Sequence, residues 1–123
     1  MKVRIQKNNI RFRLKQQEVN QFEQAGKVSE VLEFGADAEN KLTFTLEAFD
    51  EPEFAVQFKA NTTTIFVPSI LAEKWTTTEL VGFDGRIDTG KGRTISILVE
   101  KDFVCMDGRE EDNVGSYPNP LMK

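Results

Sequence analysis

Among its 123 residues this sequence has no histidine, one cysteine (Cys105), one tryptophan (Trp75) and one tyrosine (Tyr117). Histidine is the commonest general base and metal ligand, so its absence excludes Ser-His-Asp and Cys-His catalysis and the zinc motifs that use histidine. A single cysteine excludes an internal disulfide and is typical of a reducing compartment. We therefore expect a protein that is not an enzyme and has no cofactor and no metal site.

Long hydrophobic runs are also lacking, and none approaches the ~20 apolar residues that a membrane span needs. The chain begins MKVRIQKNN, which has no apolar stretch of the kind found in secretory signals. A composition of 39% hydrophobic and 29% charged residues is typical of one soluble globular domain. We expect one cytoplasmic domain, residues 1–123, with no membrane partner.

The formal net charge of −4 hides an uneven distribution along the chain. The first fifteen residues hold no acid and six bases: Lys2, Arg4, Lys7, Arg11, Arg13 and Lys15. Residues 100–123 hold six acids and three bases. The sequence thus predicts a basic N-terminal hairpin and an acidic C-terminal segment.

The chain resembles itself when it is shifted, without a gap, so that Val3 falls on Val56. The same shift sets Phe12 on Ile65, Phe22 on Trp75, Val28 on Val81 and Leu46 on Val99. Such self-similarity predicts a duplicated structural unit. We expect repeat one at residues 2–50, repeat two at 54–103, and an irregular acidic tail at 104–123.

Each repeat has the pattern of two strands, a short helix and two more strands. In repeat one we expect strands at 2–7, 10–14, 28–34 and 42–47, a turn at 8–9, and a helix at 16–25 that ends at Gly26. In repeat two we expect strands at 54–59, 63–67, 80–87 and 94–99, a turn at 61–62, a loop at 88–93, and a helix capped by Ser69. The predicted fold class is mainly β with two short helices (α+β), a pseudo-two-fold small β-barrel of two ββαββ repeats whose core holds Phe22 and Trp75.

The order of elements also resembles a known family. The stretches VRIQKNNIRFRLKQQEVNQF and AVQFKANTTTIFVPSILAEKWTTTELVGFDGRI are similar to the swapped-hairpin unit of AbrB and MazE-type transcription regulators and antitoxins. That resemblance implies two units interlocked in one small β-barrel, although a related cradle-loop barrel would give the same order. Farther on, VEKDFVC, Arg109, Glu111-Asp112 and YPNP resemble an uncharacterised bacterial family of unknown function, which implies a bacterial cytoplasmic origin.

The basic hairpin is the main candidate site. Alternation should project Arg4, Arg11 and Arg13 from one face, where they could neutralise phosphates. The AbrB resemblance implies that basic residues of this stretch contact DNA, here Arg4, Lys7, Arg11 and Arg13. Repeat two offers Lys59 but has Thr62, Thr64 and Phe66 where repeat one has basic or amide residues. In the alternative interpretation these bases pair with Glu30, Glu33 or Glu47, or protect a sheet edge.

Other motifs favour structural interpretations. The carboxylates of Glu100–Asp112 could bind a hard cation but lack a calcium-loop spacing, so a solvated acidic tail is the simpler interpretation. Cys105 lies among acids that oppose thiolate formation, and we interpret it as a buried or half-buried thiol. Glu47 and Glu100 could face each other like catalytic carboxylates, yet exposed strand-end glutamates are common. Gly90-Lys91-Gly92 is a turn rather than a phosphate loop.

The sequence alone leaves the function unknown. We favour a non-enzymatic binding or regulatory module with a protein or small-ligand partner. The alternative is an AbrB-like nucleic-acid-binding regulator that uses the basic N-terminal hairpin, although a pI near 4.9 argues against a DNA-binding domain. We expect a monomer or a weak homodimer.

Overall fold

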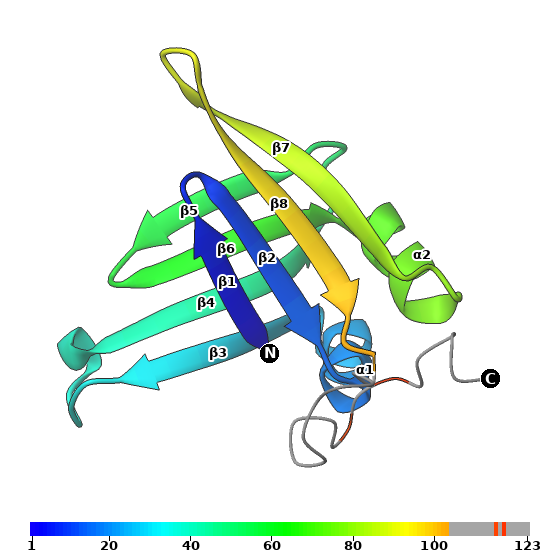
Figure 1. The fold of residues 1–123 in the computed structure, drawn as a ribbon, viewed down its shortest axis with the longest axis horizontal. Helices are drawn as coiled ribbons and strands as arrows, with labels where there is room; N and C mark the ends of the chain where they lie inside the picture. The colour runs from blue at the N-terminus through cyan, green and yellow to red at the C-terminus, as the bar shows by residue number, and fades with distance from the viewer. Residues whose placement is uncertain (104–114, 116, 118–123) are drawn as a thin grey trace.

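The structure is a computed structural model, and it describes residues 1–103, 115 and 117. Eight strands, two α-helices and one short 3₁₀ turn follow one another along the chain (Figure 1). Their bounds are β1 (Lys2–Gln6), β2 (Asn9–Leu14), α1 (Gln16–Ala25), β3 (Lys27–Glu33), η1 (Ala38–Asn40), β4 (Lys41–Phe49), β5 (Ala55–Lys59), β6 (Thr62–Pro68), α2 (Ser69–Thr77), β7 (Gly82–Gly90) and β8 (Arg93–Lys101).

The strands form two four-stranded sheets, and each sheet takes strands from both halves of the chain. Sheet A has the order β1-β2-β8-β7, and sheet B has the order β3-β4-β6-β5. In each sheet two antiparallel hairpins meet at a parallel pair, β2 with β8 in sheet A and β4 with β6 in sheet B. The mainly β, α+β class is confirmed. Among the described strands, however, the two sheets stay separate, and no ladder closes them into the barrel that we expected.

The pairings of the two sheets recur at the shift that carries Val3 onto Val56, which we call the repeat offset. The pairs Val3↔Phe12 and Phe12↔Val99 of sheet A correspond at this offset to Val56↔Ile65 and Ile65↔Leu46 of sheet B. The β7–β8 hairpin departs from this rule.

Leu46 pairs with Val28, and the matching Val99 pairs with Phe83 rather than with Val81. Compared with repeat one at the repeat offset, the segment between α2 and β7 therefore holds two extra residues. We call the shift that carries Val28 onto Phe83 the longer offset. Because of this insertion, Val81 is 44% exposed, and Phe83 is buried at the place that the gapless alignment gave to Val81. That part of the alignment is wrong.

The first helix has the bounds that the sequence predicts. Helix α1 spans the predicted residues, and Gly26 follows it in the left-handed conformation (φ 77°). Its N–H donates to the carbonyl of Phe22 at 2.9 Å. Helix α2 differs from the prediction, because Pro68 occupies the N-cap position and Ser69 is the first helical residue. The Ser69 hydroxyl instead donates to the Asp50 carboxylate at 2.8 Å.

The hairpin turns differ from the predicted ones in position or length. The turns at 7–8 and 60–61 each come one residue earlier than expected, since Asn9 and Thr62 already pair in their strands. Lys7, Ala60 and Asn61 adopt positive φ to make these turns. Likewise β7 and β8 run on to a two-residue turn at 91–92, where a loop of six residues was expected.

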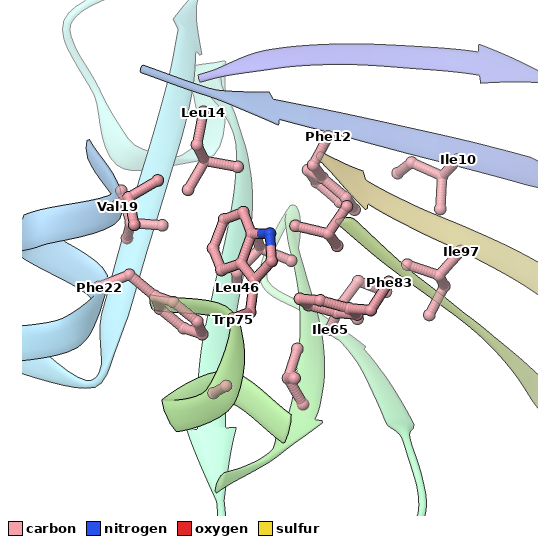
Figure 2. Close-up of a cluster of buried hydrophobic side chains, with 14 of the residues drawn as sticks. Ile10, Phe12, Leu14, Val19, Phe22, Leu46, Ile65, Trp75, Phe83 and Ile97 are labelled. Atoms are coloured by element: carbon pink, nitrogen blue, oxygen red, sulfur yellow. The ribbon is translucent and has the colours of Figure 1, made fainter. Parts of the chain in front are cut away.

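The core lies where the two helices close one end of the crossed sheets, as Figures 1 and 2 show. Trp75 is fully buried at its centre, and its indole N–H donates to the carbonyl of Val81 at 3.0 Å. The rings of Phe22 and Phe83 meet it edge-on, with centroids 6.2 and 5.4 Å away. The predicted core role of Phe22 and Trp75 is confirmed.

Two charged side chains are buried where β8 ends, Lys101 and Asp102. Lys101 is 8% exposed, and its ammonium donates to the carbonyl of Thr78 at 2.8 Å. The same ammonium lies 5.9 Å from the ring centre of Trp75 and 5.7 Å from that of Tyr117. Burial lowers the pKa of Lys101, and the nearby Glu79 carboxylate opposes this only in part. Within residues 1–103, 115 and 117, no helix is long and apolar enough to cross a membrane.

Candidate functional site: a basic cleft on sheet A

The outer face of sheet A carries the basic residues of the first hairpin. Phe12 and Leu14 of β2 are fully buried, so Arg11 and Arg13, which alternate with them, face outward. The β1–β2 register sets Arg4 opposite Arg11 and Lys2 opposite Arg13. One face of the sheet therefore carries two neighbouring rows of basic residues, Arg4 with Arg11 and Lys2 with Arg13.

A cleft of about 610 Å³ opens on this face. Its lining comes from all four strands of the sheet. The outward-facing side chains are Arg4, Gln6, Asn9, Arg11, Asp84, Arg86, Ser96 and Leu98. Three arginines against one aspartate give these side chains a net charge of 3 − 1 = +2.

The register orders these side chains in two neighbouring rows. One row runs from Arg4 through Arg11 and Leu98 to Asp84, and the next runs from Gln6 through Asn9 and Ser96 to Arg86. Arg86 thus lies in the row next to that of Arg11 and two strands away from it. At the usual strand spacing the two strands are roughly 10 Å apart. The cleft presents cations at two ends and amides, a hydroxyl and one leucine between them.

One carboxylate partly neutralises the face. Glu100 Oε1 lies 3.5 Å from Arg11 Nε and 3.6 Å from Arg13 Nε. Both distances are too long for good hydrogen bonds, and Oε1 is buried with no hydrogen-bond partner among the described residues. In that same part of the chain, Arg4 and Arg86 make no ion pair within 4.0 Å. Donors of at least two guanidinium groups therefore remain available to an anion.

Like charges directly opposite each other on neighbouring strands destabilise a sheet. The Arg4–Arg11 pair is such an arrangement, and an anion bound between the two guanidinium groups would relieve it. A guanidinium presents parallel N–H donors that match the oxygens of phosphate or carboxylate. The cleft therefore presents the kind of donors that bind an oxyanion.

Sheet B provides an internal comparison. The positions that match Arg4 and Arg11 at the repeat offset hold Gln57 and Thr64, and the position that matches Arg86 at the longer offset holds Val31. The same strand arrangement forms in sheet B with neutral residues there. Folding of this sheet architecture therefore does not require arginine at these positions.

The structure brings together only part of the predicted site. Arg4 and Arg11 line the cleft as neighbours. Arg13 lies one row away beside Glu100, and Lys7 lies in the β1–β2 turn, so neither lines it. Sequence reasoning missed Arg86, because only the pairing of β2 with β8 brings the second hairpin beside the first. The alternation of Asp84, Arg86 and Asp88 indicates an exposed strand face, but it does not indicate which strands lie beside that face.

The predicted acidic partners are also different. Glu30, Glu33 and Glu47 lie on sheet B. Among the described residues, the carboxylates within 4.0 Å of the basic side chains of the hairpin are Glu100, near Arg11 and Arg13, and Asp102, at 3.2 Å from Lys2. Glu47 and Glu100 lie on different sheets and do not form a facing pair. Cys105, Arg109 and the acids Asp107 and Glu110–Asp112 lie outside the described residues.

The fold and the cleft together define a small α+β protein of two mixed four-stranded sheets with a basic outer face. Residues 1–121 match DUF7009, a family of unknown function, and the chain belongs to that family. No curated protein and no solved structure matches the chain. The resemblance to AbrB and MazE-type units stays a prediction.

Proposed function

We propose that this protein is a non-enzymatic binding module whose cleft on sheet A takes a compact anion that carries phosphate or carboxylate groups. The observation that carries the proposal is the convergence of Arg4, Arg11 and Arg86 on one cleft that has a single acidic side chain in its lining. The neutral residues at the matching positions of sheet B support it, because the same strand arrangement forms there without arginine.

The size and lining of the cleft suit a small molecule. Ligand pockets usually measure about 300–1,000 Å³, and this one falls within that range. Gln6, Asn9 and Ser96 add neutral donors and acceptors between the cations, and Asp84 can accept from a hydroxyl or amino group. A ligand with an anionic group at Arg4 and Arg11 and a polar remainder toward Arg86 would satisfy all of them.

We also infer that the two halves arose from one duplicated ββαββ unit. The recurrence of the β1–β2 and β2–β8 pairings at the repeat offset supports this inference, with a short insertion before β7. A common origin with the AbrB and MazE-type unit would favour nucleic acid as the anion. The overall charge of −4 disfavours it, because duplex binding usually needs a strongly basic protein.

Calorimetric titration with pyrophosphate and with citrate tests the proposal. The informative variant is the double substitution Arg4→Gln with Arg11→Thr, which installs the residues that sheet B carries at these positions. Its control is Lys59→Gln with Lys74→Gln, which removes the same charge from exposed sites elsewhere. We expect at least one probe to bind, the cleft variant to lose about tenfold or more in affinity, and the control to change less than about threefold.

Absence of binding by both probes, or equal losses in the two variants, would remove the cleft as a receptor for compact anions. Anisotropy of a labelled mixed-sequence duplex at about 50 mM salt addresses the nucleic-acid alternative. Duplex binding that the cleft variant abolishes, without binding of either small probe, would replace the small ligand by nucleic acid.

A further inference from the structure

Strand β3 is an outer strand of sheet B. In the described chain its only strand partner is β4, and Figure 1 shows it along the lower border of that sheet. Val31 and Leu32 of β3 are 45% and 55% exposed, and Phe34, just beyond the strand, is 73% exposed. An exposed strand edge with apolar side chains is a template for pairing with another chain.

The hydrogen bonds to β4 show which backbone groups of β3 point outward. Ala48 N–H donates to the carbonyl of Gly26 at 2.8 Å, and Phe34 N–H donates to the carbonyl of Asn40 at 2.7 Å. Gly26 and Phe34 are both even-numbered, and bonding alternates along an antiparallel strand. The backbone groups of Lys27, Ser29, Val31 and Glu33 therefore face the outer edge.

The matching strand of sheet A has a charged residue where the centre of β3 has an apolar one. At the longer offset, Ser29, Val31 and Glu33 correspond to Asp84, Arg86 and Asp88 of β7. Charged residues on an edge strand discourage association, and β7 also has an irregularity at Asp88–Gly90. Because β3 has Val31 where β7 has Arg86, the centre of the β3 edge is apolar, and its charged residues Lys27 and Glu33 lie toward the two ends.

We propose that β3 pairs antiparallel with β3 of a second copy of this chain and so joins two B sheets into one. Centring the two-fold axis on Glu30 sets Lys27 opposite Glu33 of the second copy, and Ser29 opposite Val31 of the second copy. All these residues have outward backbone groups, so the ladder hydrogen bonds can form. The charge pair occurs twice by symmetry, which makes the edge self-complementary.

The same register places Leu32 beside Val28 of the second copy and extends the apolar face. Glu30 lies opposite its own equivalent, an arrangement of like charges. Its carboxylate already accepts from the Met1 ammonium at 2.6 Å, which offsets part of that repulsion. A shift of register by one residue in either direction would pair outward backbone groups with inward ones, so the charge pattern and the hydrogen bonds favour the same alignment.

Sedimentation equilibrium of the full chain over about 1–500 μM measures the association and its Kd. Lys27→Glu alone and Glu33→Lys alone should each raise the dimer Kd about tenfold, since each change appears twice in the interface. The double swap, Lys27→Glu with Glu33→Lys, should restore the Kd to within about threefold of the wild type. Within one copy, Lys27→Glu faces Glu47 of β4, and Glu33→Lys faces Lys41 of β4, so each single swap creates a like-charge pair. The double swap keeps both of these pairs. A restored Kd can therefore come only from pairing between copies.

Two further variants complete the test. Val31→Lys should abolish the dimer, because it places a charge at the centre of the edge. Ile70→Glu is the control, since Ile70 is 84% exposed on α2, away from β3, and its change should leave the Kd unaltered. A wild type that remains monomeric over the whole range, a double swap no better than the single swaps, or a Val31→Lys protein that still dimerises would each overturn the proposal.

Discussion

Gly85 of β7 offers a sharp test of how the linker between the halves packs. A Cβ atom added at this glycine would lie 2.5 Å from Cε2, 2.6 Å from Cδ2 and 2.9 Å from Cζ of the Phe54 ring. Real Cβ atoms do not approach a ring so closely, so Gly85→Ala must displace Phe54. That ring stacks on Phe83 at 6.0 Å, and Phe83 in turn packs on Trp75. Overpacking of this kind costs about 1–3 kcal/mol.

A double-mutant cycle with Phe54→Ala isolates the clash. Removing the half-buried ring alone should cost roughly 2 kcal/mol in lost burial. In that background Gly85→Ala meets no ring and should change stability by less than about 0.5 kcal/mol, or improve it slightly. Urea unfolding followed by circular dichroism measures all four proteins. We expect a coupling free energy of about 1 kcal/mol or more; additivity within about 0.5 kcal/mol would refute the packing of Phe54 on Gly85.

Three other predictions follow from the core and the charged residues. Trp75→Ala should lower the free energy of unfolding by about 3–5 kcal/mol, and Ile70→Ala by less than about 0.5 kcal/mol, as urea midpoints would show. Because burial lowers the pKa of Lys101 below 10.5, the unfolded state binds more protons between the two pKa values, and this lysine's contribution to stability rises with pH there. Any advantage of Lys101→Met over the wild type should therefore shrink as the pH rises toward 10.5, and a difference that stays constant up to that pH would contradict the pKa shift. Glu100→Gln should tighten pyrophosphate binding a few-fold, since it removes the carboxylate that competes for Arg11; weaker binding by calorimetry would count against the cleft.

Local patterns in the sequence were enough to predict most elements. Alternation in β1, β2 and β8 and the Gly26 helix end follow directly from residue chemistry. The shift of the turns at 7–8 and 60–61 escaped prediction because asparagine tolerates either turn position. The two-residue insertion before β7 was invisible because Val81 and Phe83 are both apolar, and only packing against Trp75 selects Phe83.

The candidate site was half predictable for a related reason. Arg4 and Arg11 belong to one hairpin, so alternation alone places them on one face. Arg86 joins them only through the parallel pairing of β2 with β8, which links strands from opposite ends of the described chain. Nothing local in the sequence identifies that neighbour, nor that Glu100 approaches Arg11 and Arg13 in place of the acids of sheet B.

The arginine side-chain N–H signals, followed by NMR during titration with pyrophosphate, test the central claim most directly. Anion binding in the cleft predicts saturable shifts of the Nε–H signals of Arg4, Arg11 and Arg86. Arg93, at the far end of the β7–β8 hairpin and outside the cleft lining, should stay unchanged. Shifts of Arg93 equal to those of the cleft arginines, or no saturable shift at Arg4 and Arg11, would contradict the assignment of this cleft as an anion receptor.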